Sequence, residues 1–394
     1  MLTSLALIFL LGMLLGSVFS RLKLPSLLGM LLTGIILGPY TLNLIDGNLL
    51  AISADLRSLA LVIILTRAGL ALDLQDLKKV GRPAILMCFV PACFEMAGMV
   101  LLAPKFLGIT TLDAAILGSV VAAVSPAVVV PRMLKLMDED FGTGKGIPQL
   151  VMAGASVDDV FVIVLFTTFT GLANGSGMSP IQLVRVPVSV ALGIAVGAAL
   201  GLLLSWAFHK IHMRDSAKVI LLLSLAFLLM ALEKAVEACV PFSGLLAVMA
   251  VGTALLRAYP VLARRLSSKF SKLWVAAEIL LFVLVGATVD IQYAMATSTA
   301  AILLLLLVLL FRMAGVFFCL LGTRLSGKER LFCMIAYTPK ATVQAAIGGI
   351  PLAMGLSCGP IVLTVAVLSI LITAPLGALG IDLSYKKLLS RTAK

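Results

Sequence analysis

The sequence predicts an all-α polytopic membrane protein of about thirteen transmembrane helices, and three observations support this fold class. Hydrophobic residues make up 61% of the chain and charged residues 12%, whereas soluble domains carry about 25% charged residues. Long apolar runs follow one another from end to end, and the loops between them alternate between rich and poor in Lys and Arg. A soluble α/β protein is excluded because so few charges cannot cover a water-facing surface.

Each apolar run is close to the roughly 20 residues that a helix needs to cross the hydrocarbon core of a bilayer. The first run lacks a basic segment before it and a small-residue cleavage site after it, so we expect a retained span rather than a signal peptide. The predicted spans are residues 2–20, 26–44, 56–73, 82–104, 111–131, 147–172, 181–207, 216–235, 240–257, 270–289, 297–322, 329–354 and 359–384.

The basic loops predict how the spans are oriented. The largest basic group is placed in the loop between the ninth and tenth spans: Arg257, Arg264, Arg265, Lys269 and Lys272. Because cytoplasmic loops are enriched in Lys and Arg, the alternation predicts an outside N-terminus and a cytoplasmic C-terminus. The net charge of +12 then follows from membrane topology, and we expect lipid rather than nucleic acid as a partner.

The second half of the chain repeats short motifs of the first half. Phe-Glu-Met-Ala-Gly at 94–98 matches Phe-Arg-Met-Ala-Gly at 311–315, and Asp73 matches Asp290 at the same offset. The matched spans are seven apart, an odd number, so the two copies have opposite orientations in the membrane. Inverted repeats are typical of secondary transporters, in which the substrate binds near the midplane of the bilayer.

Two adjacent acids, Asp158 and Asp159, interrupt the apolar span at 147–172. An ionised carboxylate at membrane depth is costly, and repulsion between neighbouring carboxylates favours a proton on one of them. Carboxylate oxygens are also hard ligands that suit sodium-like ions. The pair therefore predicts a site that holds a proton or a cation. A role in ending the helix is disfavoured because the sequence is apolar on both sides.

Proline residues inside two spans predict broken helices at equivalent positions of the two repeats. Ser125-Pro126 lies in the span at 111–131, and Thr338-Pro339 lies in the span at 329–354. A proline inside a helix removes a backbone hydrogen bond, and transporters use such breaks to present backbone groups to an ion. We expect the breaks to cross beside Asp158-Asp159. Two roles stay open for the hydroxyls of Ser125 and Thr338, ion binding and bonding back to their own helices.

Three of the other charged residues inside apolar spans bear on this site. Lys340 follows the second break, where we expect it to neutralise the negative C-terminal ends of the half-helices. Glu95 and Arg312 occupy equivalent repeat positions and carry opposite charges, which favours a buried ion pair between them. Pairing of Arg312 with Asp158 is the alternative, and the sequence does not choose between the two.

Three motifs together resemble the cation/proton antiporter superfamily. They are Ala-Val-Ser-Pro-Ala-Val-Val-Val-Pro at 123–131, Ala-Ser-Val-Asp-Asp at 155–159 and Pro-Lys-Ala-Thr-Val-Gln-Ala-Ala-Ile at 339–347. The likeness covers nearly the whole chain and is greatest to the NHA-type sodium/proton exchangers, with a looser one to bacterial antiporters that carry an aspartate pair. It implies an NhaA-like fold of inverted repeats with two crossing broken helices.

The resemblance also implies a function. It implies exchange of Na⁺ or Li⁺ for protons by alternating access, with no cofactor and no enzymatic reaction. Asp159 would be the main ion-binding carboxylate and Asp158 its partner, and Glu95 and Arg312 would form an inter-helix ion pair.

By the same resemblance, residues 1–394 form one transporter unit that assembles into a homodimer. Within it, residues 1–55 and 216–260 are expected to form the dimerisation scaffold, residues 56–172 and 270–385 the ion-transporting core, and residues 181–207 the helix that links them.

The chain departs from the family pattern in two respects. Arg312 stands where electrogenic bacterial relatives often carry Lys, and arginine does not release its proton in proteins. Proton transfer would then rest on the aspartates, which favours one-for-one exchange. The long N-terminal tail of animal members is missing, which favours a bacterial protein of the inner membrane.

Three other functions fit parts of the same pattern. K⁺/H⁺ exchange stays open, because cation selectivity depends on cavity geometry that a sequence does not show. An intramembrane aspartyl protease needs two facing carboxylates, whereas Asp158 and Asp159 are helix neighbours whose side chains diverge by about 100°. An ion channel is disfavoured by the inverted repeat and the single buried acid site.

Overall fold

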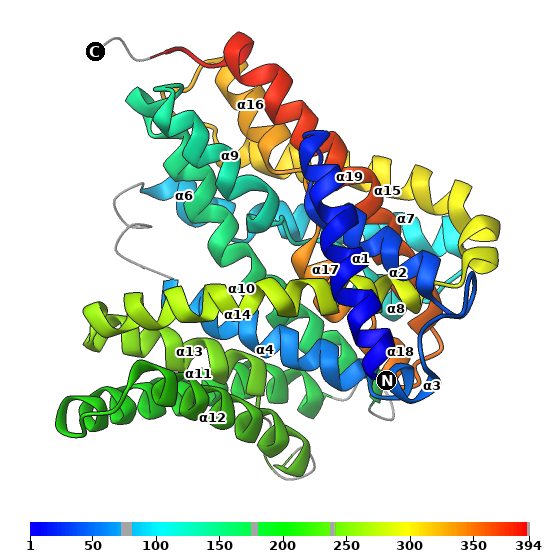
Figure 1. The fold of residues 1–394 in the computed structure, drawn as a ribbon. Coiled ribbons are helices and arrows are strands. Elements are labelled where there is room, and N and C mark those ends of the chain that lie inside the picture. Colours follow the sequence, from blue (N-terminus) through cyan, green and yellow to red (C-terminus); the bar gives the residue numbers. More distant parts are fainter. Residues whose placement is uncertain (72–80, 175–179, 237–239, 241, 392–394) are drawn as a thin grey trace. The chain divides into compact units, whose positions relative to one another are not determined.

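The computed structural model describes residues 1–71, 81–174, 180–236, 240 and 242–391, and the regular elements in these ranges are helices (Figure 1). An isolated β-bridge joins Phe141 to Arg391. Asp73, which the predicted repeat matches with Asp290, lies outside the described residues. The chain divides into two compact units.

Unit 1 comprises residues Met1–Ala54, Gln75–Phe166 and Ile279–Lys394. It also contains the first part of α10 (Ile147–Asn174), the end of α14 (Pro260–Ala287) and the 3-10 helix η1 (Thr143–Lys145). Its other helices are α1 (Leu2–Arg21), α2 (Ser26–Leu37), α3 (Gly47–Ala51), α6 (Arg82–Met87), α7 (Val90–Leu107), α8 (Thr111–Val121), α9 (Pro126–Asp138), α15 (Ile291–Cys319), α16 (Gly327–Ala336), α17 (Thr342–Ile347), α18 (Ile350–Ala353) and α19 (Gly359–Leu388).

Unit 2 comprises residues Asp55–Leu74 and Thr167–Glu278. It holds most of α4 (Ser53–Ala71) and of α14, together with α11 (Pro180–Lys210), α12 (Asp215–Val236) and α13 (Gly244–Ala258). Small residues let α11 and α13 approach closely, as membrane helices often do. A Cβ atom at Gly193 would lie 2.6 Å from Ser243 O, and one at Gly201 would lie 2.5 Å from Val251 O.

A helix lies at each predicted span, and the helices follow one another in the predicted order. Among the described residues, nine helices or helix pairs are long and apolar enough to cross a membrane, and three shorter apolar helices cover Ser26–Leu37, Gly244–Ala258 and Thr342–Ala353. With α4 they account for a helix at each predicted span. The number of membrane crossings itself stays a prediction.

The basic loop predicted between the ninth and tenth spans is largely helical. The predicted span at 270–289 belongs to α14, which begins at Pro260. Arg264, Arg265, Lys269 and Lys272 therefore lie on a helix rather than in a loop. The predicted order of spans was unaffected, because the basic residues occupy only the first part of a long helix whose remainder is apolar.

Both predicted breaks are present. Between α8 and α9 the helix is interrupted at residues 122–125, and α9 restarts with Pro126 as its first residue. Between α16 and α17 it is interrupted at residues 337–341, around Pro339. Proline suits the first position of a helix, where its missing N–H has no intrahelical partner. A further interruption, which the sequence analysis did not predict, separates α6 from α7 at Cys88 and Phe89.

The repeat motifs pack against each other reciprocally. A Cβ atom at Gly98 of α7 would lie 2.8 Å from the ring of Phe311, and one at Gly315 of α15 would lie 3.0 Å from Cβ of Phe94. Phe94 and Gly98 are the repeat equivalents of Phe311 and Gly315. Each helix thus places its phenylalanine on the glycine of the other, as expected for two copies related by a pseudo-two-fold axis.

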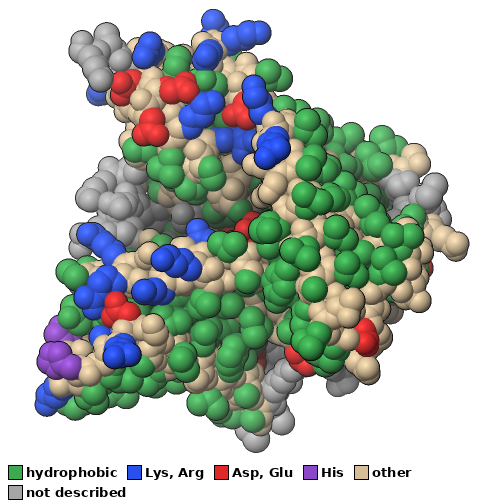
Figure 2. Space-filling view, in the orientation of Figure 1, with side chains coloured by type: hydrophobic (Ala, Val, Ile, Leu, Met, Phe, Trp, Pro, Cys, Tyr) green, Lys and Arg blue, Asp and Glu red, His purple; other side chains and the backbone are tan. Residues whose placement is uncertain are grey.

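Charged side chains gather at one end of unit 1. In the face shown in Figure 2, Lys and Arg side chains cluster where α9, α16 and the C-terminal end of α19 lie, above a mostly hydrophobic flank. Lys145 pairs with Glu329 of α16 at 2.8 Å, and Arg132 pairs with Asp382 of α19 at 3.3 Å. Basic residues from three regions of the chain thus lie at the same end of unit 1.

Candidate ion-binding site

The break between α8 and α9 exposes consecutive backbone groups, and side chains from other helices satisfy them. Val121 O accepts from Lys340 Nζ at 2.7 Å, and Ala122 O accepts from Arg312 Nη1. Val124 N donates to Asp158 Oδ2 at 2.8 Å. Buried backbone groups are costly when unpaired, so these side chains make the break stable inside an apolar unit.

The two breaks contact each other directly. Ser125 N donates to Pro339 O at 2.8 Å, which joins the gap of the first broken helix to the gap of the second. Arg312 Nε donates to Tyr337 O, at the C-terminal end of α16, at 2.6 Å. The positive charges of Arg312 and Lys340 thus lie at the carbonyl ends of α16 and α8, where a helix dipole favours cations.

Four buried charges form one connected cluster. Arg312 Nη1 lies 2.8 Å from Glu95 Oε2, and Arg312 Nη2 lies 2.7 Å from Asp158 Oδ2. Lys340 Nζ lies 2.6 Å from Glu95 Oε1. All four side chains are at most 1% exposed. The two pairings that the sequence left as alternatives for Arg312 therefore exist together, because the planar guanidinium group offers separate donors to each carboxylate.

The cluster is balanced in charge without Asp159. Arg312 and Lys340 carry two positive charges, which offset Glu95 and Asp158. Asp159 is half-buried, and its Oδ1 has no hydrogen-bond partner among the described residues. A buried charge normally needs a partner. Asp159 is therefore the acid of this site that lies outside the balanced set of charges.

The two hydroxyl residues at the breaks differ in their contacts. Ser125 Oγ is buried and has no hydrogen-bond partner among the described residues. Thr338 Oγ1 donates to Ile335 O of its own helix at 2.8 Å. Thr338 thus adopts the back-bonded alternative, while Ser125 keeps a free oxygen at the break.

Two residues of the site were not singled out in the sequence. Gln344 of α17 donates from Nε2 to Val121 O at 3.2 Å and to Ala123 O at 2.9 Å. Tyr337 donates from its hydroxyl to Met87 O at 3.2 Å and contacts Gly154, one turn before Asp158. Gln344 lies inside the motif at 339–347, so its position near the second break was a signal that the sequence offered.

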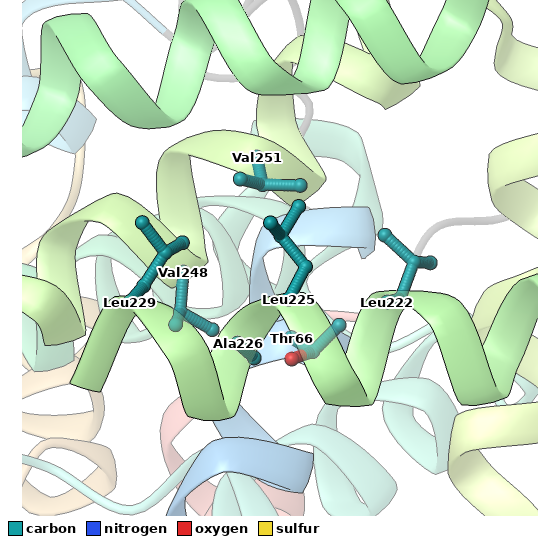
Figure 3. A pocket seen from close by; sticks show the side chains of 7 residues that line it. All are labelled: Thr66, Leu222, Leu225, Ala226, Leu229, Val248 and Val251. Atoms are coloured by element: carbon teal, nitrogen blue, oxygen red, sulfur yellow. The ribbon is translucent and has the colours of Figure 1, made fainter. Parts of the chain in front are cut away.

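Unit 2 contains a pocket with a mostly apolar lining. It is lined by Thr66 and by six apolar residues: Leu222, Leu225, Ala226, Leu229, Val248 and Val251 (Figure 3). The Thr66 hydroxyl donates to Val62 O of its own helix at 2.8 Å. The lining thus offers no charged group that could bind a cation, and the site in unit 1 is the stronger candidate.

Crossed broken helices around buried charges define a class of protein, the multi-pass membrane transporters. The chain belongs to the sodium/hydrogen exchanger family: residues 5–383 match the family described as "Sodium/hydrogen exchanger, transmembrane". Members of this family are transporters rather than enzymes.

Individual relatives agree with this assignment. The chain is 36% identical to human sodium/hydrogen exchanger 9B2 over 389 residues, which cover 93% of this chain and 70% of the relative. It is 30% identical to human sodium/hydrogen exchanger 9B1 over 382 residues, covering 93% and 73%. The sodium proton antiporter MjNhaP1 from Methanocaldococcus jannaschii, solved at pH 8, superimposes with a TM-score of 0.85 at 22% identity, covering 98% of both chains. The last match shows a shared fold.

Proposed function

We propose that this chain exchanges Na⁺ or Li⁺ for H⁺ across a membrane by alternating access, and that cation and proton compete for Asp158 and Asp159. The relatives named as sodium/hydrogen exchangers support the choice of cation and proton as substrates. The observation that carries the proposal is the charge balance of the buried cluster, which leaves Asp159 Oδ1 without a hydrogen-bond partner among the described residues.

The competition follows from electrostatics. When Asp159 is ionised, the site carries one net negative charge, and burial of such a charge is unfavourable unless it is neutralised. Either a proton or a monovalent cation neutralises it, so binding of one displaces the other. Asp158 Oδ1 and Ser125 Oγ are buried oxygens without partners in the described part of the chain, and we assign them as further cation ligands. Thr338 is a weaker candidate because its hydroxyl is already satisfied by a hydrogen bond to its own helix, whereas that of Ser125 is not.

The cluster also bears on stoichiometry. Arg312 keeps its proton in proteins, and here it holds Glu95 and Asp158 at once. Proton transfer in this proposal therefore rests on the aspartates, with one cation exchanged for one proton.

The assembly and location are part of the proposal. We infer a homodimer with residues 1–55 and 216–260 as scaffold, residues 56–172 and 270–385 as the moving core, and residues 181–207 as the link. The division into compact units differs from this assignment at residues 1–54, which belong to unit 1, and at residues 56–74, 167–172 and 270–278, which belong to unit 2. We further propose an inner-membrane protein with an outside N-terminus and a cytoplasmic C-terminus, which the distribution of Lys and Arg supports.

The experiment is proton flux in proteoliposomes that contain the full chain. Na⁺, Li⁺ and K⁺ are added in turn to vesicles with a preset pH gradient, and the internal pH is recorded with a trapped dye. We expect Na⁺ and Li⁺ to dissipate the gradient and Asp159→Asn to abolish the response. A response to K⁺ alone would favour the K⁺/H⁺ alternative, and no response to any cation would refute the antiporter function.

A further inference from the structure

One peptide group of the first break is held from both sides. The peptide between Ala123 and Val124 accepts a hydrogen bond at its oxygen from Gln344 Nε2 at 2.9 Å. The same peptide donates from its N–H to Asp158 Oδ2 at 2.8 Å. Gln344 and Asp158 are therefore joined through a single planar unit, which transmits the orientation imposed at one edge to the other.

The orientation of the Gln344 amide follows from its neighbours. Its Nε2 faces two acceptors, Val121 O and Ala123 O. Only the NH₂ end of an amide donates, so the opposite assignment would put three oxygens together. Gln344 is 1% exposed, and its Oε1 has no partner among the described residues. Both N–H groups of the Gln344 amide thus donate to backbone oxygens of the first break.

Gln344 is the neutral member of the group that satisfies this break. Arg312, Lys340 and Asp158 also bind its backbone, but each of them carries a charge and takes part in the ion cluster. A neutral amide can fix the backbone without changing the charge of the site. Hydrogen bonds in series also polarise one another in a low-dielectric interior, so the bond from Gln344 strengthens the one to Asp158.

We propose that Gln344 is a positioning residue for Asp158. By holding the Ala123–Val124 peptide it keeps the Val124 N–H directed at Asp158 Oδ2, and so sets how strongly the site prefers a cation over a proton. The inference rests on the proposed function, because it concerns the affinity of the same exchange site.

Loss of Gln344 should weaken cation binding relative to proton binding. Without it the peptide can turn, and the Asp158 carboxylate loses one of its donors. The ionised site is then less stable, so a proton competes more effectively with the cation. The charged and titratable groups around Asp158 are otherwise unchanged: Asp159, Arg312, Lys340, Glu95, Tyr337, Cys88, Cys93 and Cys319.

The test compares Gln344→Leu and Gln344→Met with Gln149→Leu in proteoliposomes of the full chain. Gln149 lies on α10 before the aspartates and also has a buried Oε1 without a partner among the described residues, so it matches the change without touching the break. For both Gln344 variants we expect the KM for Na⁺ to rise by on the order of tenfold. That factor corresponds to the free energy that one modest hydrogen bond to a charged group contributes. The pH of half-maximal exchange should rise by about one unit, the equivalent of that factor.

A purely structural role predicts something else. It would lower the maximal rate and the melting temperature in detergent without moving the KM or the pH midpoint, and that result overturns the proposal. So would failure of both Gln344 variants to fold, or an equal shift in Gln149→Leu. An inactive wild-type protein would instead refute the proposed function. Na⁺-induced thermal stabilisation gives a readout of binding that does not depend on transport.

Discussion

Arg312 and Glu95 occupy equivalent positions of the two repeats, 217 residues apart, and their side chains meet at 2.8 Å in the interior of unit 1. Neither residue belongs to this pair alone. Arg312 also binds Asp158 and two carbonyl groups at the helix breaks, and Glu95 also binds Lys340. The symmetry of the repeat thus produces a pair, and the breaks add a second anion and a second cation to it.

We expect removal of either charge to destabilise the protein strongly. Glu95→Gln removes the carboxylate that pairs with both Arg312 and Lys340. Arg312→Gln removes the positive charge that pairs with the carboxylates of Glu95 and Asp158. Removing one partner of a buried pair costs about 3–5 kcal/mol in measured cases. The measurement is the melting temperature of purified protein in detergent.

The control is Arg132→Gln, which breaks a partly exposed pair with Asp382. Exposed pairs contribute about 0–1 kcal/mol, so its melting temperature should change little. The double exchange Glu95→Arg with Arg312→Glu should not rescue the protein, since a glutamate at 312 would face Asp158. Full rescue would show that the contact between Arg312 and Asp158 carries little weight.

Substitution of the two aspartates should separate stability from transport. Asp158 Oδ2 accepts from Arg312 and from Val124 N–H, so Asp158→Asn is expected to lower the melting temperature by several degrees. Asp159 Oδ1 has no partner among the described residues, so Asp159→Asn removes an uncompensated acid. We expect Asp159→Asn to abolish exchange while the melting temperature stays equal or rises.

The two variants are measured side by side for exchange in proteoliposomes and for melting in detergent. A large loss of stability in Asp159→Asn would show that this carboxylate has a structural partner. Added Na⁺ should raise the melting temperature of the wild type and leave that of Asp159→Asn unchanged.

Much of this fold and site could be predicted from the sequence, for identifiable physical reasons. Pro126 and Pro339 predict the breaks because proline cannot donate the backbone hydrogen bond that continues a helix. Glu95 and Arg312 were recognisable as site residues because charges are rare in apolar spans. The hydrophobic periodicity and the composition of the sequence could not show that Arg312 contacts both Glu95 and Asp158. Those contacts depend on how α7, α10 and α15 pack against one another.

The missed features have the same cause. Gln344 carries no charge and has no periodic signature, so its importance arises only from the carbonyl groups that the first break leaves free. The start of α14 was missed because its first part is basic, and hydropathy registers the apolar part of a helix rather than the helix itself.

The reciprocal contacts of the repeat predict matched effects of glycine substitution. In Gly315→Ala the new Cβ would meet Pro91 Cα at 2.8 Å, which is backbone, and in Gly98→Ala it would meet the Phe311 ring at 2.8 Å. Overpacking costs about 1–3 kcal/mol, so both variants should melt at lower temperature. Gly315→Ala should be affected more, because backbone yields less than a side chain.

A smaller residue across the interface should relieve only one of them. Phe311→Leu is expected to recover part of the stability of Gly98→Ala and none of that of Gly315→Ala. Gly171→Ala on α10 is the matched control, because a Cβ atom there would meet no other atom within 4 Å. Equal melting temperatures for all three alanine variants would contradict the reciprocal packing.

The two hydroxyls at the breaks, equivalent in the repeat, should differ in their effect on cation affinity. Ser125 Oγ is buried without a partner among the described residues, whereas Thr338 Oγ1 already donates to Ile335 O. If the free oxygen binds the transported cation, Ser125→Ala should raise the KM for Na⁺ severalfold with little change in melting temperature. Thr338→Val keeps the shape and removes a hydroxyl that is already satisfied within its own helix, so its KM should stay near that of the wild type.

The comparison measures KM at fixed pH in proteoliposomes, with the maximal rate as a check on the amount of active protein. A raised KM in Thr338→Val and none in Ser125→Ala would reverse the assignment, and it would mean that the cation approaches from the second break. Equal shifts in both would indicate that the ion lies between the two breaks, where Ser125 N already bonds to Pro339 O. The two breaks are equivalent in sequence but differ in hydrogen bonding. This pair of variants therefore tests whether the ion binds to Ser125 Oγ, the hydroxyl oxygen without a hydrogen-bond partner among the described residues.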